Sequence, residues 1–316
     1  MKILLLILLF ICNVTISGTI WDAGGNANTN WSRAQNWSPN GTPTANANVS
    51  FGNAGSIATV DSNRTVGTIT FNRNANFTIN GTSTLTINNG ISATRTGRTY
   101  TISSLLNLGG TNIWSTSTTS TTLNINSAIT SNQSVTINGT GTVNLNTNNQ
   151  QFGSLTLNDG TLGIDYKTIT LDGNTTFTGG TLRLNVLSES NHGQIIAGNS
   201  TTGNASLGNG TTNLILNSTG YYALDTDKIW LLINNSNGLT SGYFNGFNEG
   251  NIVSVGDINM RVYNNADYST GNLFGGNDIL LTIPNIPEPT TILLFGLSSL
   301  FLLSRRNILH SHCKSS

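Results

Sequence analysis

The sequence predicts an all-β protein built as an elongated, right-handed parallel β-helix (β-solenoid) with a β cap at each end. Apolar residues recur as doublets with one polar residue between them, and a spacing of two places both members on one face of a strand. Successive doublets begin roughly 7 to 12 residues apart, with clusters of Asn and Gly between them. Repeated short strands with regular corners indicate coils of chain that stack on one another.

The doublets extend from about residue 66 to residue 216, and Thr or Asn usually separates their two members. They are Ile69 and Phe71, Phe77 and Ile79, Leu85 and Ile87, Leu123 and Ile125, Val135 and Ile137, Val143 and Leu145, Leu155 and Leu157, Leu162 and Ile164, Ile169 and Leu171, Leu182 and Leu184, and Leu214 and Leu216. Corner sequences such as Asn80-Gly81 and Asn138-Gly139 accept the left-handed backbone that sharp turns need. We therefore expect the doublets to line the interior of the stack.

Composition limits the functions that this chain can have. It contains 316 residues with a formal net charge of zero, and charged residues make up only 8% of it, against about a quarter in typical soluble domains. Residues 99–158 contain no Asp, Glu, Lys or Arg. Nucleic-acid binding is not expected, because neutralising phosphates needs clustered Lys and Arg. Cys12 and Cys313 lie in the terminal segments, so no disulfide is expected in the body.

Residues 1–18 have the features of a secretory signal peptide. Lys2 supplies the positive start, residues 3–11 form an unbroken apolar core, and small residues follow at the expected cleavage position. Cys12 raises the alternative of a lipoprotein, but Ile11 precedes it where a small residue is expected. We therefore predict export across the inner membrane.

Residues 19–64 are predicted to form an N-terminal cap. Three of the five Trp residues lie here, namely Trp21, Trp31 and Trp37. The open end of a stack must be covered, and Trp covers a large apolar area, so the cap is the favoured interpretation. The alternative is that these indoles are exposed and stack on sugar rings, which makes them candidate glycan contacts.

The order of several short motifs resembles secreted bacterial proteins with autotransporter-associated β-strand repeats. The motifs are Trp-Asp-Ala-Gly-Gly (21–25), Asn-Trp-Ser (30–32), Val-Gly-Thr-Ile-Thr-Phe (66–71), Gly-Ser-Leu-Thr-Leu-Asn-Asp-Gly-Thr-Leu (153–162) and Phe-Thr-Gly-Gly-Thr-Leu-Arg-Leu (177–184). The resemblance implies a parallel β-helix at or outside the cell surface and supplies no catalytic residue. On this basis, residues 65–218 are the solenoid repeats and residues 219–284 the C-terminal β cap.

Residues 285–306 resemble a PEP-CTERM sorting signal, in which a Pro-Glu-Pro box precedes an apolar helix and a basic stop. The matching residues are Pro287, Glu288 and Pro289, the apolar segment 290–304, and Arg305 with Arg306. The arginines would hold the end of the helix on the cytoplasmic side. The resemblance implies that an exosortase, a membrane protease, processes the signal. A basic and polar tail, residues 307–316, continues beyond the usual end of such signals.

An enzyme on a β-helix would need two carboxylates, or a carboxylate with Lys or Arg, at neighbouring positions. The candidates are Asp159, Asp165, Lys167, Asp172, Arg183 and Glu189. Several lie at predicted corners, where Asp commonly forms turns. His192 is distant in sequence from the other two His residues, so no metal triad or Ser-His-Asp set is indicated. We therefore expect no catalytic residue, metal site or cofactor.

These observations predict an exported, non-catalytic structural protein of the cell surface or extracellular matrix of a Gram-negative bacterium. The family resemblance implies association with exopolysaccharide and, before processing, with the membrane through residues 290–304. Two alternatives are a carbohydrate-binding adhesin and a polysaccharide-degrading β-helix enzyme.

Overall fold

The structure, a computed structural model, describes residues 19–52, 54–198, 203–218, 228–234 and 238–284. Within these ranges the regular structure consists of β-strands and two short 3-10 helices, η1 (Ala34–Asn36) and η2 (Gly208–Gly210), without an α-helix. All of the strands belong to one compact unit, Met1–Thr282, and residues 283–316 form a second unit. The predicted signal peptide and the segment 290–304 lie outside the described residues.

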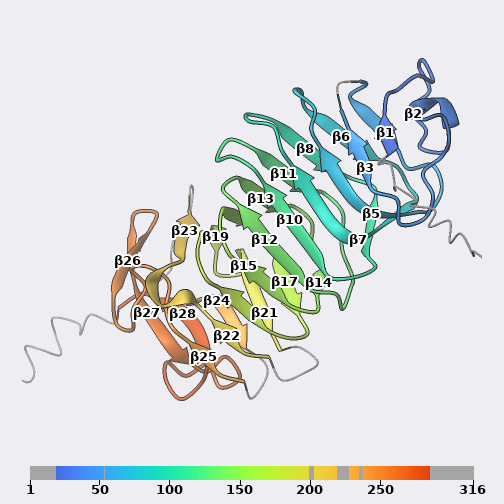
Figure 1. Ribbon diagram of the computed structural model, residues 1–316. Coiled ribbons are helices and arrows are strands. Elements are labelled where there is room, and N and C mark those ends of the chain that lie inside the picture. Colours follow the sequence, from blue (N-terminus) through green and yellow to red (C-terminus); the bar gives the residue numbers. More distant parts are fainter. Residues whose placement is uncertain (1–18, 53, 199–202, 219–227, 235–237, 285–316) are drawn as a thin grey trace, which may run out of the picture. The chain divides into compact units, whose positions relative to one another are not determined.

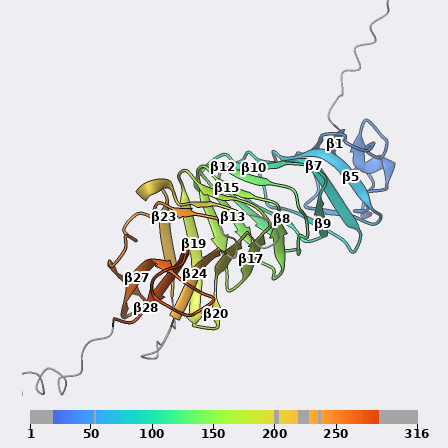
Figure 2. The same cartoon turned by 90° about the horizontal axis from the view of Figure 1, so that it is seen from below.

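The strands form three sheets, which the chain visits in turn (Figures 1 and 2). The first sheet contains β2 (Trp37–Ser38), β1 (Thr19–Trp21), β3 (Val49–Phe51), β5 (Arg64–Phe71), β7 (Thr84–Ala93), β10 (Asn112–Thr116), β12 (Val135–Gly139), β15 (Leu155–Leu157), β18 (Thr175–Phe177), β22 (Ala205–Ser206) and β25 (Thr240–Ser241), with β9 (Leu105–Leu108) also paired to β7. The second contains β20 (Asn191–His192), β19 (Thr181–Ser188), β16 (Thr161–Ile164), β13 (Thr142–Leu145), β11 (Thr122–Ile125), β8 (Thr99–Ile102), β6 (Phe77–Asn80) and β4 (Ile57–Thr59), with β23 (Asn213–Asn217) paired to β19. The third contains β14 (Gln150–Phe152), β17 (Thr168–Leu171), β21 (Gln194–Ala197), β24 (Lys228–Asn234), β28 (Asp278–Thr282), β27 (Ile258–Ala266) and β26 (Ile252–Val255).

Each strand of the stack pairs in parallel with the strand one coil later, so the predicted β-solenoid is confirmed. Val135 and Ile137 of β12 lie opposite Leu155 and Leu157 of β15, which makes this coil 20 residues long (135 to 155). The same register continues into β18, where Leu157 lies opposite Phe177. Doublet therefore lies on doublet, and the inward side chains of neighbouring coils share one apolar interior.

The interior contains the apolar doublets, as predicted, and also several polar residues. Every doublet member is buried except Leu216, which is half-buried. Polar residues also occupy inward positions, among them Gln150 and Asn112, which are buried and hydrogen-bonded to backbone groups of the previous coil. Buried polar groups need such partners, since leaving one unpaired costs about 1–3 kcal/mol.

Glycine at the corners allows the coils to approach closely. Gly139, which ends β12, has a φ of 85°, and a Cβ atom at this position would lie 2.1 Å from the carbonyl oxygen of Thr116 in the preceding coil. A side chain would therefore force the two coils apart as well as strain the backbone.

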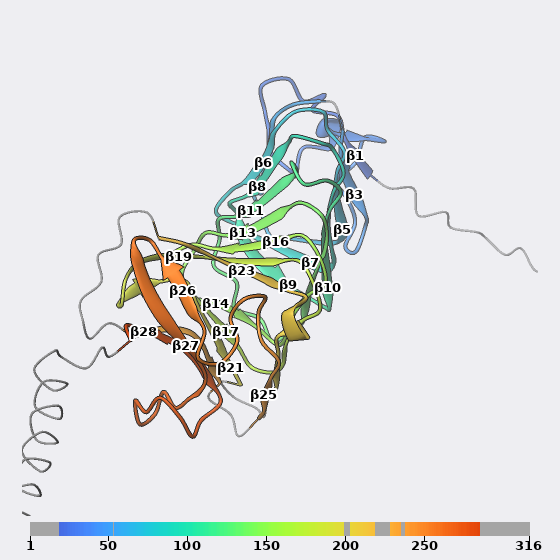
Figure 3. The same cartoon turned by 90° about the vertical axis from the view of Figure 1, so that its left-hand side faces the viewer.

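The stack ends with a change of strand direction. β24 pairs in parallel with β21 on one edge and antiparallel with β28 on the other. β28, β27 and β26 then continue the third sheet as an antiparallel meander (Figure 3). A small apolar cluster packs β24, β27 and β28 together, and its members are Trp230, Ile233, Ala266 and Leu280.

Candidate functional site

The residues of the predicted sorting signal, Pro287, Glu288, Pro289, Arg305 and Arg306, lie outside the described residues. Within the part of the chain that the structure describes, no helix is long and apolar enough to cross a membrane.

The three N-terminal indoles are buried, which contradicts their proposed role as glycan contacts. Trp21 is 1% exposed, and Trp31 and Trp37 are 0% exposed. The Trp37 ring centroid lies 5.0 Å from that of Trp21 and 4.8 Å from that of Trp31, and its Nε1 donates to the Trp31 carbonyl at 2.8 Å. A sugar ring can stack only on an accessible indole face. In this structure, the three residues instead pack against Phe51 at the first coils of the stack.

A buried amide that the sequence analysis missed holds the loop over these indoles. The Asn36 side chain donates from Nδ2 to the carbonyls of Asn28 and Asn30, both at 2.9 Å, and its Oδ1 accepts from the Gly25 backbone N–H. Asn36 is fully buried. Trp31 and Trp37 stand out in the sequence because Trp is rare. Asn36 does not, because the chain contains many Asn residues and nothing in the sequence distinguishes this one.

Three of the candidate catalytic residues, Asp165, Arg183 and Asp172, each contact an amide side chain of another coil. Asn185 Nδ2 donates to Asp165 Oδ1 at 2.7 Å, and Arg183 Nη2 donates to Asn144 Oδ1 at 2.7 Å. Gln151 Nε2 lies 3.2 Å from each carboxylate oxygen of Asp172. Arg183 belongs to β19 of the second sheet and Asp165 follows β16 of that sheet, whereas Asp172 follows β17 of the third sheet. The three residues therefore act as hydrogen-bond partners between coils.

Of the other residues considered, Asp159 has a local contact, whereas His192 contacts a distant part of the chain. Asp159 Oδ1 accepts from the backbone N–H of Gly160, as a turn former does. His192 Nε2 lies 3.1 Å from the Trp230 carbonyl oxygen, and burial lowers the pKa of this imidazole. Among the described residues, no group of three or more His, Cys, Asp or Glu side chains is arranged to hold a metal ion.

The outer faces of the stack carry rows of hydroxyl and amide groups. On the second sheet, five threonines occupy equivalent positions of successive coils. They are Thr99, Thr122, Thr142, Thr161 and Thr181. Amide side chains also bridge successive coils, for example Asn144 to Asn124 at 2.8 Å and Asn158 to Asn138 at 2.9 Å. Because neighbouring strands lie about 4.7–4.9 Å apart, these rows present uncharged donors and acceptors at a regular spacing.

Comparison with known proteins identifies one segment. Residues 285–307 match the PEP-CTERM protein-sorting motif, in agreement with the resemblance found in residues 285–306. No curated protein and no solved structure matches the chain. A PEP-CTERM motif implies processing by an exosortase and an exported, surface-anchored protein of a Gram-negative cell. The chain is therefore a β-solenoid targeted by a C-terminal PEP-CTERM motif.

Proposed function

We propose that this protein is an exported, non-catalytic structural component of the bacterial cell surface or extracellular matrix that associates with exopolysaccharide. The sorting motif supports export, and a stack of coils with a shared interior gives the rigid body that a scaffold needs. The segment 290–304 would hold the precursor in the membrane until an exosortase-type protease cleaves it. The repeats would belong to the autotransporter-associated type.

The observation that carries the association with polysaccharide is the chemistry of the outer faces. Rows of Thr hydroxyls and Asn amides repeat along the stack, as in the Asn124–Asn144 and Asn138–Asn158 pairs. Sugar hydroxyls both donate and accept hydrogen bonds, so an extended glycan lying along such a row can form one contact per coil. Many weak contacts at a regular spacing can add up to substantial avidity.

Cell fractionation with mass measurement of the mature protein tests the export part of the proposal. We expect the wild-type protein at the surface or in the matrix, without residues 1–18 and without its apolar tail. The variant Glu288→Ala should remain membrane-bound and unprocessed, whereas Pro284→Ala, a proline outside the box, should be processed normally. Recovery of the intact C-terminus in the cytoplasm would contradict export.

Incubation of the purified full chain with exopolysaccharide tests the structural role. We expect co-sedimentation with the polymer and no release of reducing ends. Release of reducing ends that is lost in Asp165→Asn or Asp172→Asn would instead support the polysaccharide-degrading alternative.

The adhesin alternative retains one supporting observation, at the C-terminal end of the body. Tyr268 and Phe274 are 50% and 63% exposed, and the Phe274 ring lies 5.4 Å from the Tyr263 ring. Exposed aromatic rings can stack on sugars. Loss of glycan-array binding in Tyr268→Ala and Phe274→Ala, with no loss in Tyr243→Ala, would favour this second function.

A further inference from the structure

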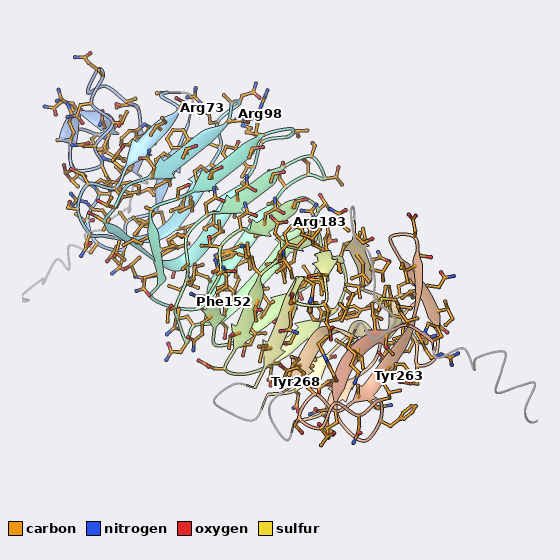
Figure 4. All side chains as sticks on the ribbon, turned by 180° about the vertical axis from the view of Figure 1, so that it is seen from behind. Arg73, Arg98, Phe152, Arg183, Tyr263 and Tyr268 are labelled. Carbon is orange, nitrogen blue, oxygen red and sulfur yellow. The ribbon has the colours of Figure 1, made fainter. Side chains whose placement is uncertain are left out.

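Three arginines gather at one corner of the stack. Arg73 lies between β5 and β6, and Arg95 and Arg98 lie between β7 and β8, at the same corner one coil later. Figure 4 shows Arg73 and Arg98 side by side at this edge, with Arg183 further along the stack. Arg95 is exposed, and Arg73 and Arg98 are half-buried. We refer to Arg73, Arg95 and Arg98 as the arginine corner.

Hydrogen bonds to the preceding coil orient two of these side chains. Arg95 Nε donates to the Asn72 carbonyl at 2.7 Å, and Arg98 donates from Nε and Nη2 to Asn74 Oδ1 at 3.2 and 3.0 Å. These bonds use one nitrogen of Arg95 and two of Arg98. The other guanidinium nitrogens of both residues have no hydrogen-bond partner among the described residues, so donors remain available to a ligand.

Arg73 also has donors without an acceptor. Its Nε and Nη1 atoms are enclosed, and neither finds a hydrogen-bond partner within the described chain. Its backbone carbonyl accepts from the Tyr100 hydroxyl at 2.6 Å, which fixes the corner beneath the side chain. Because these two nitrogens are enclosed, Arg73 contributes to the corner chiefly through its positive charge.

No acidic residue belongs to the two coils that carry the arginine corner or to the coil that follows them. Residues 62–158 contain neither Asp nor Glu, and the next coil carries only Ser and Thr at this corner, in residues 117–121. Burial raises the pKa of Tyr100 above its usual value, and the charges of Arg95, Arg98 and Arg73 offset this only in part. In a chain with zero net charge, three cations gathered at one place form a strong local positive potential.

From this arrangement we propose that the arginine corner binds the carboxylate groups of an acidic polysaccharide. A guanidinium offers parallel N–H donors that match the two oxygens of a carboxylate. Arginines in two successive coils can hold acidic groups of one chain, while the uncharged rows nearby contact its hydroxyls. The proposal rests on the proposed association with exopolysaccharide and adds that the polymer carries negative charge.

Binding of polygalacturonate, a polymer of uronic acid, by the full chain tests this inference, with neutral dextran as the comparison polymer. We expect saturable binding to polygalacturonate that weakens as salt is added, because salt screens exposed charges. The triple variant R73Q/R95Q/R98Q should lose affinity by about tenfold or more. Arg183→Gln, which removes an arginine already bound to Asn144, should bind like the wild type.

Three results would overturn the inference. The first is failure of the wild type to bind polygalacturonate, and the second is equal binding by wild type and triple variant. The third is tighter binding of duplex DNA through the same arginines, which would assign the corner to phosphate. Should the triple variant unfold, Arg95→Gln alone changes an exposed residue and must still weaken binding. Normal surface delivery and dextran binding in a variant without polygalacturonate binding would leave the proposed structural role intact.

Discussion

The two ends of the stack are covered in different ways. At the N-terminal end, the large side chains of Trp21, Trp31 and Trp37 fill the opening above Phe51. At the C-terminal end, the third sheet changes strand direction, because β28 pairs antiparallel with β24, the last parallel strand of that sheet. An exposed end of a parallel stack would invite further coils to add. The N-terminal end is therefore closed mainly by side-chain volume, with the two-residue antiparallel strand β2 at its edge, whereas the third sheet at the C-terminal end is closed by three antiparallel strands.

Removal of the Trp37 indole at the N-terminal end should cause the largest loss of stability. Trp37→Ala should lower the free energy of unfolding by about 3–5 kcal/mol, because it opens a cavity between Trp21, Trp31 and Phe51. Chemical denaturation measures this loss. Hydrogen exchange should show lost protection confined to the first coils, since each coil contacts only its neighbours.

Ile20→Ala is the matched control for this variant, because Ile20 lies in β1 beside Trp21 but is 48% exposed. It should change stability by less than about 0.5 kcal/mol. An equal loss in both variants, or lost protection extending to β26–β28, would mean that the N-terminal end is not an independent seal.

Substitution of glycine should cost more stability at a corner where coils approach closely than at a corner with open space around it. Gly139→Ala should cost about 2–4 kcal/mol, because it adds a clash with the preceding coil to the strain of a positive φ. Gly246→Ala has a similar φ of 79° but no atom within 4 Å of the new Cβ, so only the strain of about 1–2 kcal/mol remains. Thermal unfolding of the pair measures the difference, and equal losses would refute the close approach of the coils.

The C-terminal end should respond to mild acid through His192. Burial holds the pKa of this imidazole below its ordinary value of 6.5, so the unfolded chain takes up a proton first as the pH falls. Stability is therefore full above pH 6.5 and decreases as the pH is lowered through the folded pKa. His192→Gln should remove this part of the pH dependence, whereas Gln194→Ala, which loses a bond to the same Trp230 carbonyl, should retain it. A wild type with no stability change between pH 7 and 5 would contradict the assignment.

The N-terminal end should respond only to stronger acid, and weakly. Burial raises the pKa of Asp61, but hydrogen bonds from the Ser32 hydroxyl and backbone N–H outweigh this and hold it below 3.8. The stabilising effect is therefore present above the unfolded pKa and is lost as the pH falls through the lower folded value. Asp61→Asn should reduce stability at neutral pH by less than about 1 kcal/mol, because the carboxylate is largely solvated.

Asp267→Asn provides the comparison for this effect at the other end. The hydrogen bond from the Ser269 hydroxyl lowers the pKa of Asp267, but both residues belong to one local turn. Hydrogen exchange, measured along an acid titration, should show lower protection of the loop around Ser32 in Asp61→Asn. In Asp267→Asn, it should show lower protection of the local turn alone. The same pattern of loosening in both would mean that Asp61 does not tie the N-terminal loop to the stack.

The sequence predicted the periodic part of the fold well, because the doublets carry their own geometry. Alternation fixes which side chains point inward, and equal spacing in successive coils fixes the register, as Val135 and Leu155 show. Inward polar residues such as Gln150 could not be found in this way, since only the preceding coil provides their partners. The handedness of the helix and the division at residues 64 and 218 remain predictions.

The candidate sites were predictable to different degrees. The PEP-CTERM signal is a contiguous motif, so reading residues 285–306 was enough to find it. The indoles of Trp21, Trp31 and Trp37 were equally visible, but their exposure depends on the fold, and their burial removes the accessible ring face that the glycan alternative needs. The arginine corner escaped notice because Arg73 and Arg98 become neighbours only when one coil is placed on the next.

The uncharged wall of the stack has a further consequence for the chain once it is outside the cell. Proteases that cleave after lysine or arginine have no target between Arg98 and Lys167. This stretch contains the coils from β8 to β16. Enzymes of that kind should release it as a single long fragment even after denaturation, and digestion with trypsin followed by mass spectrometry would find it uncut.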